Sequence, residues 1–181
     1  MALLISNDVT ARVLKMTDAV DAMENVLKQY AQGLATFQPR TDFWAPTATS
    51  GDYSRWGSLL GMMYDPPTLA LRFKSDILTW TEYDDAVTEE WHNMEPGTYC
   101  GFVILIDMRN GEIIGLINDG ILQHARVGAT AGVGAKHLAR EDSTVLGVVG
   151  SGGMPYAYTE AICSVRPIEE IRVYSPCLGI K

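Results

Sequence analysis

The chain has 181 residues, 47% of them hydrophobic, which is enough for one sizeable domain or two small domains around a packed core. Its 22 acidic residues outnumber its 14 basic residues, and the net charge of −8 argues against nucleic acid as the main partner. Three scattered cysteines without metal-ligand spacing predict a reduced, cytoplasmic protein with no metal site. No signal peptide or long apolar span indicates secretion or a membrane partner.

The first predicted elements are a short strand and an amphipathic helix. Residues 2–5 are apolar and can form the strand. Thr17 is a suitable N-cap, and apolar residues then recur every three or four positions as far as Leu34, which predicts a helix with one buried face. Arg40 follows in a loop or at a strand entry. Residues 42–58 are rich in Thr, Ser, Gly and Trp, which predicts an irregular segment.

Two further strands are predicted before an acidic stretch. Residues 59–64 can form the first of these strands, and alternation over residues 69–74 predicts the next, with Arg72 and Lys74 on one face. Two cations on one strand face suit an anionic ligand, but they also suit a solvent-exposed sheet surface. The acidic residues between positions 82 and 90 predict a solvated loop.

A hairpin and a helix are predicted in the middle of the chain. The apolar segments 102–106 and 112–117 flank Asn110 and Gly111, which together are a strong turn signal between two strands. Residues 121–139 then predict a helix that is unusually rich in Gly and Ala. So many small residues predict that a neighbouring element approaches this helix closely.

The segment from 144 to 175 predicts a strand, a glycine turn, a helix and a second strand. The strands are expected at residues 144–149 and 171–174, the turn at 150–154 and the helix at about 156–165. Glycines in this position let backbone N–H groups approach a pyrophosphate at a helix N-terminus. An ordinary strand–turn–helix with glycines for geometry alone has the same pattern. Pro155 stands where a small residue usually allows close packing, and it removes one possible phosphate donor.

The order of the elements predicts an α/β protein. An α+β domain rich in strands is expected over residues 1–120, a connecting helix over 121–143, and the start of a Rossmann-type dinucleotide-binding domain over 144–181. Only two parallel strands of this last domain are expected, whereas a Rossmann sheet needs more strands to bury both faces. We therefore expect an incomplete cofactor domain. Either another chain supplies the missing half, or the sequence is a fragment or an interrupted reading frame.

Residues 117–140, 146–154 and 166–175 together resemble the ornithine cyclodeaminase/mu-crystallin family. The resemblance implies an NAD(P)-dependent oxidoreductase that acts on a small amino or imino acid, as an amino-acid dehydrogenase or an imino-acid reductase. A cyclodeaminase that releases ammonia from a diamino acid, and a truncated non-catalytic binding or dimerisation subunit, are the alternatives. The resemblance also implies a homodimer joined through the N-terminal domain, residues 1–120, which would bind the substrate.

The resemblance assigns roles to three cations. Arg40 and Arg126 fall at the positions of arginines that hold the substrate carboxylate, and an arginine fork suits a carboxylate because it donates two parallel hydrogen bonds. Arg126 is also expected near the nicotinamide. Lys74 falls at the position of a lysine that contacts substrate, and it is the expected catalytic residue because a desolvated lysine can give or accept a proton. Val127 departs from the family, in which a threonine is common at this position.

The resemblance also implies a set of residues that bind NAD or NADP. They are Arg126, Gly150, Ser151, Gly152, Gly153, Met154 and Ser175. Ser175 replaces the acid that would bind a ribose 2′-hydroxyl at the end of the second strand. A serine there is compatible with the 2′-phosphate of NADP, but Pro176 and Cys177 offer no arginine to bind that phosphate. The family's catalytic aspartate belongs to a later part of the cofactor domain than this sequence contains.

Overall fold

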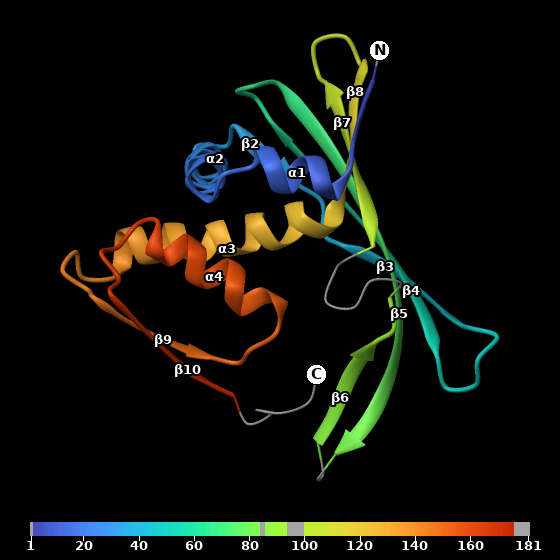
Figure 1. The fold of residues 1–181 in the computed structure, drawn as a ribbon. Helices are drawn as coiled ribbons and strands as arrows, with labels where there is room; N and C mark the ends of the chain where they lie inside the picture. Colours follow the sequence, from blue (N-terminus) through green and yellow to red (C-terminus); the bar gives the residue numbers. More distant parts are fainter. Residues whose placement is uncertain (1, 84–85, 94–99, 176–181) are drawn as a thin grey trace. The chain divides into compact units, whose positions relative to one another are not determined.

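The computed structural model describes residues 2–83, 86–93 and 100–175 (Figure 1). The chain divides into two compact units, each assembled from two segments. The first unit comprises Met1–Ala11 and Gln29–Ile121, and the second comprises Arg12–Lys28 and Leu122–Lys181. The division into a substrate domain and a cofactor domain stays a prediction.

The described part of the first unit is built on an eight-stranded sheet in which only β1 and β8 pair in parallel. The strand order is β1-β8-β7-β5-β4-β2, with β3 beside β4 and β6 beside β5. The strands are β1 (Leu3–Ile5), β2 (Ala35–Phe37), β3 (Thr41–Pro46), β4 (Tyr53–Met63), β5 (Thr68–Tyr83), β6 (Ala86–Trp91), β7 (Gly101–Asp107) and β8 (Ile113–Asn118). The predicted hairpin around Asn110 and Gly111 is confirmed, since it joins β7 to β8.

Strand β5 is the longest strand and changes partners along its length. On one edge it pairs with β4 from Thr68 to Leu78. On the other edge it pairs with β7 from Thr68 to Lys74 and with β6 from Leu78 onward. Lys74 therefore lies at the end of the β7 pairing, close to the point where the partner strand changes.

Residues 42–58 were expected to be irregular, and this prediction is wrong because they contain most of β3 and the first half of β4. Aromatic residues favour strands, and Phe43 and Trp56 pair directly across β3 and β4. The Ser and Gly residues between them masked the alternation. Through these strands Arg55 lies directly opposite Asp76 of β5, and Asp42 lies in the same row as Lys74, with Gly57 of β4 between them.

The acidic stretch was expected to form a solvated loop, and this prediction is wrong for the residues that the structure describes. Glu82 lies in β5, and Glu89 and Glu90 lie in β6, where they pair across the sheet with Trp80 and Thr79. Asp84 and Asp85 lie outside the described residues.

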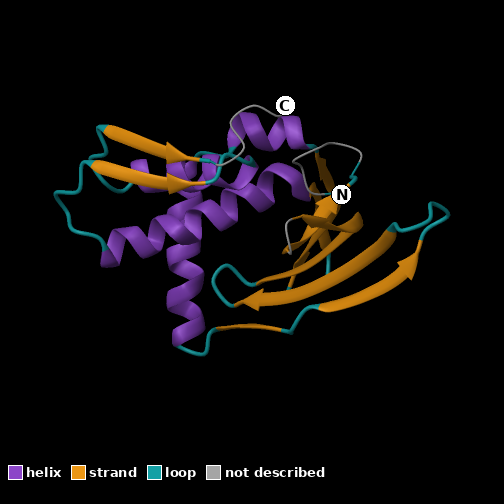
Figure 2. Ribbon diagram, turned by 90° about the horizontal axis from the view of Figure 1, so that it is seen from below, coloured by secondary structure: helices purple, strands orange, loops and turns teal. Residues whose placement is uncertain are grey.

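In its described residues, the second unit contains three helices packed together and a pair of parallel strands. The elements are α2 (Met16–Ala31), α3 (Asp119–Leu138), α4 (Gly153–Cys163), β9 (Val145–Val149) and β10 (Glu170–Tyr174). Both α2 and α3 continue into the first unit, which also contains most of α1 (Asn7–Val13). β9 and β10 lie side by side (Figure 2).

The helices α2, α3 and α4 bury a common apolar core of small side chains. Its members are Met16, Ala19, Val20, Ala125, Ala129, Val133, Ala157 and Ala161. A Cβ atom built at Gly128 would lie 2.5 Å from the backbone oxygen of Ala157, and one at Gly132 would lie 3.1 Å from the Cβ of Ala161. The close approach that the small residues of α3 predict is therefore confirmed, and the approaching element is α4. None of the described helices is long and apolar enough to cross a membrane.

Candidate functional site

Lys74 lies in a buried cluster of charged side chains near the middle of β5. Its amine donates a 2.6 Å hydrogen bond to Oδ2 of Asp76, and the two side chains are only 4% and 0% exposed. Arg55 on β4 donates to the same oxygen from Nε at 3.1 Å and from Nη2 at 3.0 Å. Burial alone would raise the pKa of the Asp76 carboxyl, but the hydrogen bonds from Lys74 and Arg55 outweigh burial and lower that pKa below its usual value.

Tryptophan rings flank the two cations of this cluster. The Arg55 guanidinium lies 5.2 Å from the ring centre of Trp44 and 5.4 Å from that of Trp91. The Lys74 amine lies 5.8 Å from the ring centre of Trp91. Both distances to Trp91 fall within the range of cation–π attraction, so this ring stabilises both positive charges while keeping water away. Glu89 adds a second carboxylate, 3.4 Å from Nη1 of Arg55.

Arg40 reaches the same part of the sheet by way of Asp42. Asp42, Gly57 and Lys74 stand directly opposite one another on β3, β4 and β5. A Cβ atom built at Gly57 would lie 3.3 Å from Cε of Lys74 and would overlap Oδ1 of Asp42, so the glycine leaves room for both side chains. Arg40, whose side chain is 48% exposed, pairs with Asp42 at 2.9 Å. Of the two cations that the resemblance assigns to substrate in the first unit, Arg40 therefore directly precedes β3, and Lys74 lies on β5, with β4 between these strands.

The structure gives both cations of the β5 face a carboxylate partner. Arg72 donates to Oδ2 of Asp119 from Nη2 at 2.6 Å and from Nε at 2.8 Å, and the Asp119 side chain is 2% exposed. The sequence left two interpretations open, an anionic ligand and a solvent-exposed surface. Neither cation faces open solvent, because Arg72 and Lys74 each form an ion pair within the protein.

The glycine turn of the second unit leads into the N-terminus of α4. Gly150, with a φ of +103°, donates its N–H to the carbonyl of Tyr174 at 2.7 Å. Gly152 is the N-cap, no side-chain hydrogen bond caps the helix, and its first turn carries no acidic residue. Because Pro155 supplies no N–H, the backbone donors at this end come from Gly152, Gly153 and Met154.

Ser175 and Arg126 also belong to the second unit. Ser151 donates a 3.0 Å hydrogen bond to the hydroxyl of Ser175, which places Ser175 beside the turn. The exposed side chain of Arg126 on α3 donates from Nε and Nη2 to Oε1 of Gln123, at 3.0 and 2.9 Å. Arg40 and Lys74 are thus placed within the first unit, whereas Arg126, the turn and Ser175 are placed within the second.

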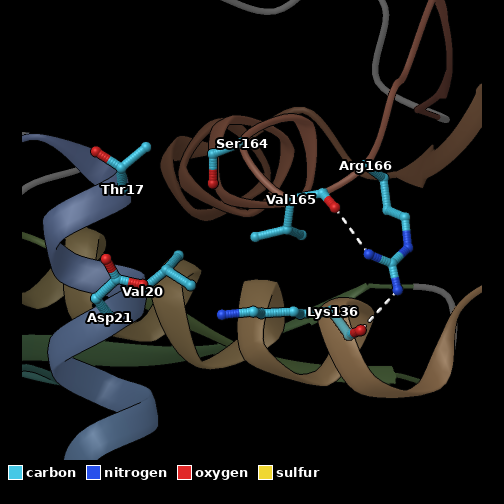
Figure 3. A pocket seen from close by; sticks show the side chains of 7 residues that line it. All are labelled: Thr17, Val20, Asp21, Lys136, Ser164, Val165 and Arg166. Carbon is cyan, nitrogen blue, oxygen red and sulfur yellow. Dashed lines mark hydrogen bonds between the residues drawn. The ribbon is translucent and has the colours of Figure 1, made fainter. Parts of the chain in front are cut away.

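A cavity of about 310 Å³ lies between helices of the second unit, and none of the predicted site residues lines it (Figure 3). Its two cations are already engaged by the protein. Lys136 pairs with Glu24 at 2.7 Å, and Arg166 donates to the carbonyls of Val165, Lys136 and Ala139 at distances between 2.6 and 2.9 Å. We conclude that these side chains hold the helices together. Elsewhere, no group of three His, Cys, Asp or Glu side chains that could hold a metal occurs among the described residues.

Three residues of the Lys74 cluster were not predicted from the sequence: Arg55, Asp76 and Trp91. Asp76 could have been found, because it stands two residues after Lys74 and therefore shares its strand face. Arg55 could not, because it lies in the stretch that was expected to be irregular. Trp91 is brought to Lys74 only by the pairing of β6 with β5.

Comparisons with known proteins agree on one family. A sequence model of the ornithine cyclodeaminase/mu-crystallin family matches residues 2–176. A Δ(1)-pyrroline-2-carboxylate reductase of Bacillus cereus is 37% identical over 78 residues, which are 43% of this chain and 24% of the reductase. The NAD(P)H-dependent anabolic L-arginine dehydrogenase of Pseudomonas aeruginosa is 24% identical over 97% of this chain and 50% of its own length.

A solved structure shows the same fold. The Δ(1)-pyrroline-2-carboxylate reductase of Thermococcus litoralis, in complex with NADH and L-proline, superposes with a TM-score of 0.76 at 24% identity, over 97% of this chain and 50% of that chain. The predicted α/β fold class is therefore confirmed. The chain spans about half the length of this reductase and of the arginine dehydrogenase.

Proposed function

The chain belongs to the ornithine cyclodeaminase/mu-crystallin family, and on this basis we propose that it forms the substrate-binding part and the first cofactor-binding part of an NAD(P)-dependent oxidoreductase. The substrate is a small amino or imino acid. The observation that carries the proposal is the buried Lys74 amine, which stands at the position of the family's substrate-contacting lysine and is fixed by a hydrogen bond. A lysine on an exposed strand face would have no such support.

The residues of the chain fit the parts of this chemistry. Arg40 and Arg126 would bind the carboxylate of the substrate, and Lys74 would give a proton to the nitrogen on the α-carbon when an imine is reduced, or accept that proton when an amine is oxidised. The backbone N–H groups of Gly152, Gly153 and Met154 bind the pyrophosphate of NAD or NADP. A Cβ atom built at Gly152 would meet nothing within 4 Å, so the turn has room for a ligand. The cofactor supplies or accepts the hydride at the α-carbon.

A turnover assay tests this function. In the intact protein we expect NADH or NADPH to be oxidised in the presence of Δ(1)-pyrroline-2-carboxylate. The measurement is the loss of absorbance of the reduced nicotinamide. Lys74→Met is expected to lower turnover by a factor of about 10²–10⁴, the usual contribution of an acid–base group. Lys15→Met changes an exposed lysine of the same chain and serves as the control. Absence of turnover with cyclic and linear imino acids would refute the reductase, and retained dinucleotide binding would then favour a non-catalytic binding subunit.

We further propose that two surfaces are covered in the assembled protein. The ring of Trp56 on β4 lies beside Phe43 on β3 and beside Phe73 on β5, and alternation along β5 puts Phe73 on the opposite face from Lys74. Phe43 is 63% exposed, which supports a homodimer joined through this face.

The pair β9–β10 leaves Val149 82% exposed, which supports further strands, from elsewhere in the protein or from a partner chain. A cytoplasmic location remains a prediction from the cysteine pattern.

A further inference from the structure

We propose that Asp76, itself fixed by Arg55, is a positioning residue that supplies the opposite charge for the amine of Lys74 and points that amine to one place on the face of the sheet. This inference rests on the proposed function of Lys74. It assigns a role to a carboxylate that the resemblance to the family does not assign. The observation that carries it is the convergence of three hydrogen bonds from Lys74 and Arg55 on one oxygen of Asp76.

Burial makes this carboxylate necessary. An ammonium group that is only 4% exposed is costly unless an opposite charge lies next to it. Asp76 supplies that charge from two residues along the same strand face, and its own side chain is fully buried. Because both side chains leave the same segment of β5, the strand itself sets the 2.6 Å distance between Nζ and Oδ2.

Arg55 fixes the carboxylate. Its Nε and Nη2 atoms both donate to Oδ2 of Asp76, and Trp44 and Trp91 flank its guanidinium. This arrangement opposes rotation of the Asp76 side chain, so the acceptor of the Lys74 hydrogen bond stays in one position. An ammonium group has three N–H donors, and within the described residues one of them is used by Asp76. The others are available to the nitrogen or carboxylate of a substrate.

The charges around Lys74 support the same conclusion. Lys74 and Arg55 share the buried carboxylate of Asp76. Glu89 forms an ion pair with Arg55. Asp42, on the far side of Gly57, pairs with Arg40. Asp76 is therefore the one carboxylate with a described hydrogen bond to the Lys74 amine, and its removal should change how readily that amine loses its proton.

The test measures acylation of Lys74 by an N-hydroxysuccinimide ester in the purified full chain, with each lysine quantified by peptide mass spectrometry. Only an unprotonated amine reacts. We expect Asp76→Asn to accelerate acylation of Lys74 about tenfold near neutral pH, because a nearby opposite charge favours the charged form by about one to three pH units. The ratio of the Lys74 acylation rate in Asp76→Asn to that in the wild type should shrink towards one as the pH rises, since the Lys74 amine is then unprotonated in both proteins. Exposed Lys15 gives the internal standard.

Asp119→Asn is the matched control. It removes an equally buried carboxylate whose ion pair is with Arg72, two residues before Lys74 on the same strand. We expect it to leave the rate at Lys74 within about twofold of the wild-type rate, and we expect Asp76→Glu, which keeps the charge, to restore slow acylation. Equal acceleration in both Asn variants, or a constant ratio at every pH, would indicate mere loosening of the sheet and would overturn the proposal.

A second variant keeps the proposal testable if Asp76→Asn does not fold. Arg55→Lys keeps a positive charge beside Asp76 but cannot donate the two hydrogen bonds of the guanidinium to Oδ2, so the carboxylate is held less firmly and acylation of Lys74 should become faster; an unchanged or slower rate would contradict the proposal. None of these measurements uses a cofactor or substrate. Failure of turnover, which tests the proposed function, can therefore be told apart from failure of Asp76 to control Lys74.

Discussion

At the scale of single residues, a missing side chain matters as much as the charged ones. Gly57 stands between Asp42 and Lys74 in the row across β3, β4 and β5. Any side chain at this position would displace the Asp42 carboxylate and press on Cε of Lys74. Gly57 therefore leaves room on one face of the sheet for the Asp42 carboxylate on one side and the Lys74 side chain on the other.

Gly57→Ala is expected to lower the free energy of unfolding by about 1 kcal/mol, because overpacking forces the neighbouring side chains to move. Gly61→Ala lies on the same strand, where a Cβ atom would meet its nearest neighbours at ordinary distances of 3.7 and 3.9 Å. That variant should be neutral or stabilising by up to about 1 kcal/mol, because alanine restricts the unfolded chain. Urea unfolding measures both changes, and an equal effect of the two substitutions would contradict this account of Gly57.

The sequence supplied candidate side chains for the site but not the residues that surround them. Lys74 and Arg40 could be assigned from the resemblance, and alternation correctly put Arg72 and Lys74 on one face. Their carboxylate partners could not be assigned in the same way. Asp119 meets Arg72 from the start of α3, 47 positions later in the chain. Such a pairing depends on how β5 and β8 are arranged in the sheet, which local patterns do not reveal.

At the scale of elements, α3 is shaped by what packs against it. Gly128 faces the backbone of Ala157 in α4, whereas a Cβ atom built at Gly134 would meet nothing within 4 Å. Two glycines in one helix therefore have different roles. The first permits close packing, and the second contributes only the flexibility of a glycine.

Gly128→Ala is expected to destabilise the protein by about 1–3 kcal/mol, because the carbonyl of Ala157 belongs to a helix backbone and cannot move aside. Gly134→Ala should instead stabilise it by about 1 kcal/mol, the difference in helix propensity between the two residues. Thermal or urea unfolding of the two variants measures these opposite shifts. A neutral Gly128→Ala variant would refute the close contact between α3 and α4.

A second link between elements is ionic and depends on pH. Hydrogen bonds from Lys136, Lys28 and His137 lower the pKa of the Glu24 carboxyl from its ordinary value of 4.5 to about 2. Because the folded-state pKa is depressed, the stabilisation is fully present above pH 4.5 and is lost as the pH falls to about 2. Glu24 thereby joins α2 to the C-terminal turn of α3.

Glu24→Gln should therefore lower the urea midpoint at about pH 7, and the difference from the wild type should shrink at about pH 3, where the unfolded chain already binds the proton. Glu160→Gln, which changes an exposed carboxyl on α4, is the control and should have little effect at either pH. A difference that stays constant between the two pH values would show that the charge of Glu24 is not responsible.

Elements with a strong period or a clear turn signal were predictable, and those with an interrupted pattern were not. The small residues of α3, the Asn110-Gly111 hairpin and the strand–turn–helix at residues 144–163 could all be identified. The helix α4 begins at Gly153, inside the expected turn, because glycine and proline hide a helical first turn from a pattern based on apolar residues. β3 and the first half of β4 were missed because Ser, Thr and Gly interrupt their aromatic residues, whereas the second half of β4 falls in the strand expected at residues 59–64.

At the scale of the whole molecule, the chain offers a substrate-type cluster in one unit and a phosphate-type turn in the other. In the turn at residues 150–153, Gly152 is a position at which an added Cβ atom would meet nothing within 4 Å.

Gly152→Asp tests whether the N–H groups of this turn bind a pyrophosphate. Aspartate is a preferred N-cap, and Gly152 has an extended backbone, with φ −75° and ψ −169°, that aspartate adopts readily. The variant should fold at least as stably as the wild type, but its carboxylate should occupy the N–H groups of α4 and repel a pyrophosphate. Gly152→Asn caps the helix in the same way without the charge, so it should impair binding less.

Titration with NADH and NADPH, followed by the fluorescence of the reduced nicotinamide, tests the central claim most directly. The account predicts saturable binding of at least one of the two dinucleotides to the wild-type chain and loss of that binding in Gly152→Asp, with an unchanged or higher unfolding temperature. Absence of saturable binding by the folded wild-type chain, or equal binding by Gly152→Asp, would contradict it.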